Sequence, residues 1–153
     1  MSSLTLSPEA VADMRVACED AYPREACGLL LGRSAEERRV LRVVVARNLD
    51  TSASRFVLDP VDFVRADGLA RDAGIEIVGV FHSHPDQPAR PSPEDEAAAQ
   101  PGWSHVIASV LGDGAAGCVG DMTSWALPKD ATQRLLTEER IEWDAGERSL
   151  RSC

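Results

Sequence analysis

Two histidines and a carboxylate are spaced so that they could bind one metal ion. His82 and His84 lie two residues apart, and Asp95 follows within the same short segment. If the histidines belong to a strand, both project to the same side and can face one cation. Two imidazoles and one carboxylate leave a tetrahedral zinc ion one open position, as in catalytic rather than structural sites. The spacing therefore predicts one Zn²⁺ per chain and a water molecule activated for hydrolysis.

The surrounding sequence predicts elements that bring these ligands together. The apolar run 75–81, IEIVGVF, is typical of a buried strand and leads directly into His82. Pro85 ends that strand, and a proline-rich loop follows it. A helix over 92–100, begun by an N-cap serine, carries Asp95 in its first turn.

Each of these residues also has a simpler interpretation. A His-x-His pair alone is more often incidental than metal-binding. Ser92 can be an ordinary N-cap whose hydroxyl accepts from the Asp95 amide, and Asp95 can be an acid that stabilises the helix dipole. Their occurrence together with strand-end and helix-start signals favours the metal site.

The pattern His82-Ser83-His84-Pro85, six residues, Ser92, two residues, Asp95 resembles the JAMM (MPN+) metalloprotease motif at every specified position. The upstream segment 23–32, PREACGLLLG, is similar to the segment that carries the family's glutamate. The similarity extends from about Leu6 to Trp143. It implies an α/β (α+β) fold with a curved mixed sheet flanked by helices, similar to that of cytidine deaminases. Deaminase chemistry is not expected, because the H-x-E and P-C-x-x-C signatures are missing from the sequence.

The resemblance implies a role for each site residue. His82, His84 and Asp95 match the family's zinc ligands, with a water completing the shell. Glu25 matches the general base, which moves a proton from that water to the leaving amine. Ser92 matches the hydroxyl that helps to stabilise the tetrahedral oxyanion. Without the family pattern, Glu25 would be interpreted as a solvated loop acid, because spacing alone does not place it beside the metal.

Members of this family hydrolyse peptide or isopeptide bonds after the C-terminal Gly-Gly of ubiquitin-like, β-grasp proteins. The chain resembles the small bacterial branch that processes sulfur-carrier proteins. We therefore expect a zinc metallopeptidase whose partner is a ubiquitin-like or sulfur-carrier protein. Two alternatives stay open: a non-catalytic MPN scaffold that binds partners, and a metallohydrolase for a small-molecule amide.

Length and charge narrow the possible functions. A chain of 153 residues that is 44% hydrophobic fits one domain, expected over 1–144 with a polar tail over 145–153. The net charge of -9, with no basic stripe, argues against binding to nucleic acid or to an anionic membrane surface. No apolar stretch approaches the roughly 20 residues that span a bilayer, and residues 1–10 do not resemble a signal peptide. We expect a cytoplasmic protein.

Further helices and strands are expected around the site. A helix over 8–21 is predicted to bury Val11, Met14 and Cys18, and a helix over 60–73 to bury Val61, Val64 and Leu69 before ending at Gly74. Strands are expected over 26–32, 40–46, 56–58, 103–111, 117–119, 123–127 and 140–143, with a hairpin turn at 112–114.

Several other residues could carry chemistry but have a more ordinary interpretation. The four cysteines, at 18, 27, 118 and 153, show no C-x-x-C spacing and are interpreted as buried reduced thiols. Cys27, close to Glu25, could instead meet the substrate or respond to oxidation. His105 is interpreted as a strand histidine rather than a fourth ligand. The tryptophans are expected to serve packing, although one of them could line a groove.

Overall fold

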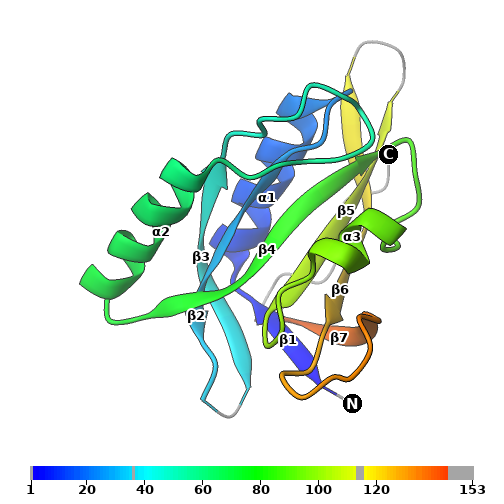
Figure 1. The fold of residues 1–153 in the computed structure, drawn as a ribbon. Helices are drawn as coiled ribbons and strands as arrows, with labels where there is room; N and C mark the ends of the chain where they lie inside the picture. Colours follow the sequence, from blue (N-terminus) through cyan, green and yellow to red (C-terminus); the bar gives the residue numbers. More distant parts are fainter. Residues whose placement is uncertain (1, 36, 113–115, 145–153) are drawn as a thin grey trace.

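The computed structural model describes residues 2–35, 37–112 and 116–144, and within them helices and strands are mixed along the chain (Figure 1). The elements are β1 (Ser3–Leu6), α1 (Pro8–Ala21), β2 (Cys27–Arg33), β3 (Arg38–Ala46), α2 (Pro60–Asp72), β4 (Glu76–Pro85), α3 (Pro93–Ala98), β5 (Ser104–Gly112), β6 (Gly117–Ala126) and β7 (Thr137–Trp143). The predicted α+β class and mixed sheet are confirmed. The likeness to cytidine deaminases and the domain boundary at 144 stay predictions.

The strands form one sheet that closes into a barrel in the order β1-β3-β2-β4-β5-β6-β7. Three pairs are parallel, namely β1 with β3, β1 with β7, and β4 with β5, whereas the others are antiparallel. Strand β4 lies between β2 and β5, and its residue His82 is paired with Cys27 on one side and Ile107 on the other. The predicted buried strand therefore places the histidines near its C-terminal end, between β2 and β5.

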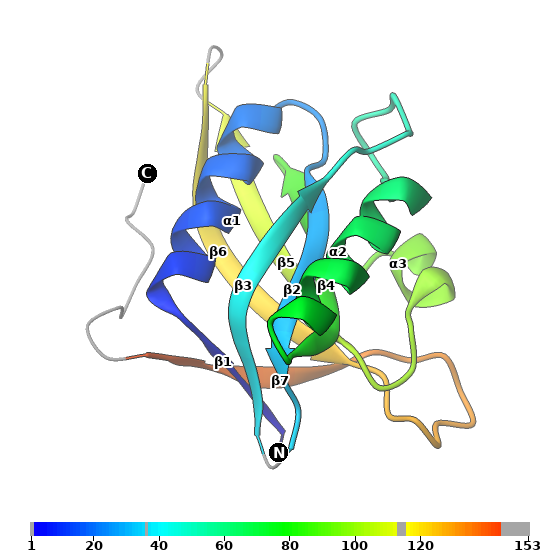
Figure 2. The same ribbon diagram turned by 90° about the vertical axis from the view of Figure 1, so that its left-hand side faces the viewer.

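Helices α1 and α2 pack on opposite sides of β2 and β3 (Figure 2). Helix α1 begins where Ser7 accepts a hydrogen bond from the Ala10 amide, and it buries Val11, Met14 and Cys18 as predicted. Its apolar face joins the core inside the barrel, which also contains Leu30 and Phe81. On the other side, α2 packs on a second cluster formed with β2, β3 and β4.

The bounds predicted for α2 are close to those observed, but its inward face is not the predicted one. Val61 and Val64 are exposed, by 73% and 69%. The buried residues are instead Ala66 and Ala70, one turn apart, with Leu69 partly buried beside them. Small alanines allow the helix to lie close to the sheet, whereas the prediction took the larger valines as the core stripe. Gly74 follows the helix with a φ of +70°, as expected for a C-terminal glycine.

Three strand predictions were wrong in extent or existence. The run 56–58 is not a strand, because only Leu58 pairs, in an isolated bridge with Asn48. The runs 117–119 and 123–127 form one continuous strand, β6, whose register against β5 shifts between Ala108 and Val110. Strand β1 was not predicted. The hairpin turn at 112–114 and the tail at 145–153 lie outside the described residues.

Most of the remaining predictions concern packing, and the structure agrees with them in part. Cys18 and Cys27 are free and buried, as expected, whereas Cys118 is disulfide-bonded. The three tryptophans pack against apolar clusters while remaining partly exposed. Among the described residues, no helix has both the length and the apolarity needed to cross a membrane.

Candidate metal centre

Three donor atoms from β4 and α3 converge on one point. The Nε2 atoms of His82 and His84 are 3.1 Å apart, and Oδ2 of Asp95 lies 3.2 Å from the first and 3.1 Å from the second. A tetrahedral zinc ion with bonds of 2.0–2.1 Å needs donors roughly 3.3 Å apart. The nearly equilateral triangle therefore has the dimensions of one face of such a site. The structure brings together all three predicted ligands.

The start of α3 fixes the position of the aspartate. Ser92 accepts a hydrogen bond from the Asp95 amide at 3.0 Å, and Asp95 Oδ2 accepts one from the Ser92 amide at 2.9 Å. This reciprocal pair is a capping box. Ser92 is thus the N-cap that the sequence allowed for, and its hydroxyl hydrogen can still be donated elsewhere.

The protonation states of the three groups suit a cation. The carbonyl of Pro88 accepts from Nδ1 of His84 at 2.9 Å, so that Nε2 is the nitrogen with a lone pair when the ring is neutral. Burial lowers the pKa of His84, but its contacts with Asp95 and the Pro88 carbonyl raise it overall. Burial lowers the pKa of His82, which favours the neutral ring that a metal ion requires. Burial opposes ionisation of Asp95, but its contacts with the two imidazoles and with the Ser92 amide hold the pKa of its carboxyl well below the ordinary range. Three electron-pair donors at contact distance, largely removed from water, are what a metal ion would bridge.

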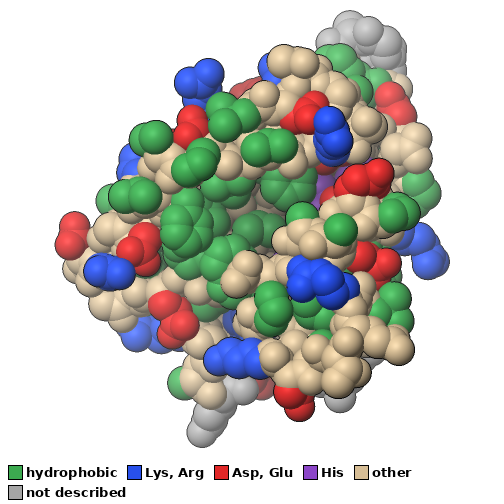
Figure 3. Space-filling view, in the orientation of Figure 1, with side chains coloured by type: hydrophobic (Ala, Val, Ile, Leu, Met, Phe, Trp, Pro, Cys, Tyr) green, Lys and Arg blue, Asp and Glu red, His purple; other side chains and the backbone are tan. Residues whose placement is uncertain are grey.

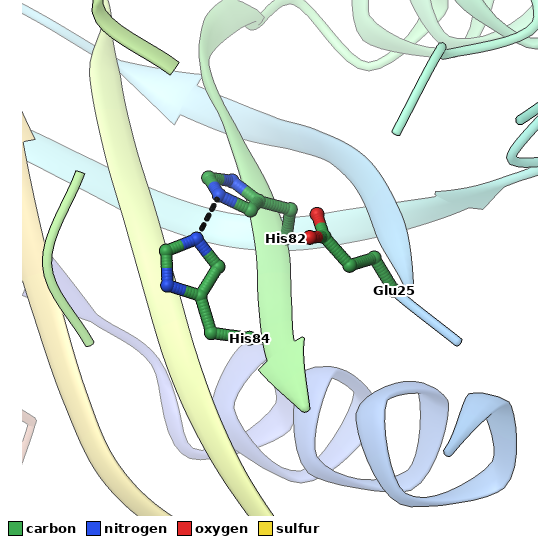
Figure 4. Close-up of side chains that lie close together, drawn as sticks. All are labelled: Glu25, His82 and His84. Atoms are coloured by element: carbon green, nitrogen blue, oxygen red, sulfur yellow. Dashed lines mark hydrogen bonds between the residues drawn. The ribbon is translucent and has the colours of Figure 1, made fainter. Parts of the chain in front are cut away.

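Glu25 lies beside this triangle, two residues before the start of β2. One carboxylate oxygen of Glu25 and the ring nitrogens of the two histidines lie within 4.8 Å of one another, and Figure 4 shows the three side chains converging. The side chain is only 4% exposed, and burial raises the pKa of its carboxyl to about 7. Its Oε1 atom is buried without a hydrogen-bond partner among the described residues. It is therefore a proton acceptor poised near neutrality and aimed at the site.

The pairing of β2 with β4 brings Glu25 into place. Cys27 pairs with His82, and beyond this pair Ser83 binds Ala26 twice, through its amide at 3.1 Å and its hydroxyl at 2.7 Å. Ser83 points away from its histidine neighbours, as predicted. Because Ser83 holds Ala26, the preceding residue Glu25 lies beside His84, the residue that follows Ser83 in β4. This contact was not foreseen from the sequence.

Two hollows lie beside the donor atoms and share Glu94 in their walls, and together they are called here the groove. One, of about 670 Å³, is largely apolar, includes His82 and Asp95 in its wall, and is visible in Figure 3 as a hollow lined by hydrophobic side chains. The other, of about 640 Å³, is more polar and includes Glu25, His84 and Ser92. The hydrophobic residues that line the apolar hollow include Leu29, Phe56, Val57, Leu58, Phe63, Val80, Trp103, Ile107 and Leu136.

Aromatic rings shape the apolar hollow. Phe56 stacks on the ring of His82 with centroids 4.6 Å apart, and Phe63 stacks on Trp103 at 6.2 Å. Trp103 is thus the groove-lining tryptophan that the sequence left open. The sequence predicted Phe56 only as part of a strand. Its stacking on His82 depends on the path of an irregular loop, and the sequence has no periodic pattern that predicts such a path.

His105 also lies in the apolar hollow but is not aimed at the metal position. One ring nitrogen accepts from the Gln100 amide at 3.1 Å, and the other lies 3.3 Å from the Trp125 carbonyl. Both nitrogens therefore already have partners. This agrees with its interpretation as a strand histidine.

The geometry defines a mixed α+β domain in which a cluster of donors that could hold one metal ion lies near the end of a central strand. The sequence model of the Prok-JAB family, described as prokaryotic homologs of the JAB domain, matches residues 7–128. Because the match covers most of the chain, the chain belongs to this family, and the resemblance to JAMM proteins is confirmed.

Individual relatives support the same assignment. The chain is 41% identical over 71 residues to a desampylase of Pyrococcus furiosus, a match that covers 46% of the chain and 49% of the relative. It is 35% identical over 86 residues to a probable TtuB-protein conjugate cleaving protease of Thermus thermophilus, covering 56% and 55%. The chain thus spans about half the length of these relatives. A solution structure from Desulfitobacterium hafniense shares the fold, with a TM-score of 0.75, 34% identity and 92% of each chain covered.

Proposed function

We propose that this chain is a zinc metallopeptidase that cleaves conjugates of a ubiquitin-like or sulfur-carrier protein after a C-terminal Gly-Gly. The observation that carries the proposal is the meeting of Glu25 with three metal donors where two halves of a groove join. The names of the relatives, a desampylase and a probable TtuB-protein conjugate cleaving protease, support a conjugate as substrate. The cytoplasmic location expected from the sequence belongs to the same proposal.

Each of the site residues has its own role in the proposed hydrolysis. His82, His84 and Asp95 would hold the ion, which when bound supplies a Lewis acid for the scissile carbonyl and lowers the pKa of water. Glu25, with a pKa of about 7, takes a proton from the attacking water and gives it to the leaving amine. The Ser92 hydroxyl donates to the oxyanion.

The groove suits an extended, narrow substrate. Its apolar half would receive the tail of the carrier and its polar half the released group, so that the bond to be cut lies between Glu25 and the donor triangle. Glycines at the end of the tail would pass the buried donors without a side-chain clash. The nearly complete enclosure of Glu25 disfavours a scaffold without catalysis, because an unused carboxylate would be buried at a cost.

The test is turnover of a purified carrier conjugate with zinc present. A Gly-Gly carrier joined to lysine or to cysteine should be cleaved, and the same carrier ending in Ala-Ala should not. Glu25→Gln should lower kcat by about 10²- to 10⁴-fold, the usual share of a general base, while stoichiometric zinc is kept. Full activity of that variant, or no cleavage of any carrier conjugate by the wild type, would refute the proposal.

A further inference from the structure

The segment 48–58 crosses the groove between β3 and α2. Asp50, Arg55 and Phe56 line its apolar half, whereas Ala53 and Ser54 line its polar half. The segment, called here the 48–58 loop, therefore borders both places where substrate would lie. It also carries the ring that stacks on His82.

One side chain fastens this loop at its neck. The Asn48 carboxamide donates to the carbonyls of Glu25, at 3.0 Å, and Arg55, at 3.3 Å. Its oxygen accepts from the amides of Asp50 and Val57, both at 2.9 Å. An amide group has two donor hydrogens and two acceptor lone pairs, so all four are used.

Other contacts close the same neck but do not reach the base. The Leu49 amide donates to the Val57 carbonyl at 2.8 Å, and the Arg24 guanidinium donates to the Asp50 carbonyl at 2.7 Å. Within the part of the chain that the structure describes, the Asn48 amide bonds both to the Glu25 carbonyl and to the far arm of the loop, at the Arg55 carbonyl. Displacement of the loop would therefore pull on the main chain of the glutamate.

We propose that Asn48 is a positioning residue that couples closure of the 48–58 loop to placement of Glu25. The carboxamide holds the glutamate through its main-chain carbonyl and leaves the carboxylate free to accept a proton. The same group sets Phe56 over His82 by fixing the residues on either side of it, Arg55 and Val57. The inference rests on the proposed function, because it assigns Asn48 to that reaction.

Two substitutions separate this role from that of a simple turn residue. Asn48→Asp keeps the size and the oxygen that accepts from Asp50 and Val57, but it loses both donors. Asn48→Ala loses all four hydrogen bonds. If Asn48 served only the turn, either variant could lose thermal stability but a folded variant would keep the wild-type kcat, whereas a positioning role lowers kcat in the folded aspartate variant with zinc content unchanged.

The experiment measures kcat and KM on a Gly-Gly carrier conjugate, together with zinc content, thermal midpoint and hydrogen exchange of residues 49–57. Asn48→Asp is expected to lower kcat about tenfold or more, the scale of a small misplacement of a reacting group, with zinc content unchanged. Exchange in the arm near Arg55 should rise. Thr51→Ala, at the exposed tip of the loop, is the matched control and should leave each quantity unchanged.

The outcomes divide clearly. Wild-type kcat in a folded Asn48→Asp enzyme would overturn the inference while leaving the proposed function intact. If the wild type cleaves no conjugate, the proposed function fails, and the assignment of Asn48 to that reaction fails with it. In that case, raised hydrogen exchange in the Asn48→Asp variant would show only that Asn48 holds the loop closed.

Discussion

The carbonyl oxygen of Pro88 lies 2.9 Å from Nδ1 of His84. A carbonyl only accepts, so the ring must carry a hydrogen on Nδ1, and in the neutral ring Nε2 is then the nitrogen that can bind a cation beside His82 and Asp95. The loop after the histidines thus selects the tautomer that can bind metal. Such outer hydrogen bonds commonly orient metal-binding histidines and raise their basicity.

Zinc should stabilise the wild-type protein against unfolding. At a free concentration about 100 times Kd, the expected gain is about 2.7 kcal/mol, measured as a rise in the thermal or urea midpoint. His84→Ala should lose this gain because it removes one corner of the donor triangle.

His105→Gln is the matched control for that experiment. Its ring nitrogens bind Gln100 and Trp125, so the variant can lose stability but should keep the zinc-dependent increment. An unchanged increment in His84→Ala would contradict the assignment of this ligand.

Two glycines should respond to alanine in opposite directions. A Cβ at Gly79 would lie 2.1 Å from the Ser104 carbonyl oxygen, so Gly79→Ala should destabilise by about 3 kcal/mol. A Cβ at Gly68, within α2, would meet nothing within 4 Å, so Gly68→Ala should stabilise by about 0.5–1 kcal/mol. Urea unfolding of both variants checks the spacing of β4 and β5, and equal effects would be inconsistent with it.

The free energy of unfolding should decrease as pH rises, because the thiol of Cys18 is buried. Burial raises the pKa of its thiol from 9.0 to about 12. Below pH 9 the thiol is protonated in both the folded and the unfolded state, and its contribution to stability is fully present. Above it the unfolded chain loses the proton first, so stability declines by about 1.4 kcal/mol per pH unit until the folded thiol also titrates.

The measurement compares urea midpoints of the wild type and Cys18→Ala from about pH 8 to about pH 10.5, a range in which the thiol contributes. The variant should show a shallower decline, whereas Val16→Ala, on the exposed side of the same helix, should follow the wild type. Parallel curves for wild type and Cys18→Ala would exclude the buried thiol as the cause.

The orientation of α2 can be tested with a pair of substitutions. Val64 is 69% exposed, so Val64→Ser should change the free energy of unfolding by no more than about 0.5 kcal/mol. Ala66 is fully buried against the sheet, so Ala66→Leu should cost about 1–3 kcal/mol. The reverse order of effects would restore the face predicted from the sequence.

Local signals in the sequence were sufficient for the elements that present the donors. The cap at Ser7, the apolar run before His82 and the Ser92 start of α3 each depend on neighbouring residues, and the structure agrees with all three. The same holds for the convergence of the histidines with Asp95, since strand alternation and a short return loop determine it.

Features that depend on distant partners were not predictable in this way. Strand β1 is four residues long and is held by parallel pairing with β3 and β7, which no local pattern encodes. Glu25 was located through family resemblance, because its position results from pairing across 57 residues, Ala26 with Ser83. Asn48 and Phe56 lie in an irregular loop, and their partners are set by its path.

The donor triangle and the glutamate differ in how far apart their parts lie along the chain. Residues 82–95 contain all three donors, whereas Glu25 joins them only through the pairing of β2 with β4. Contacts between distant residues carry the greater loop-closure entropy and form late in folding. The ability to bind a metal ion should therefore arise earlier during folding than the ability to hydrolyse a bond. A partly folded chain could then hold the ion without catalysing hydrolysis.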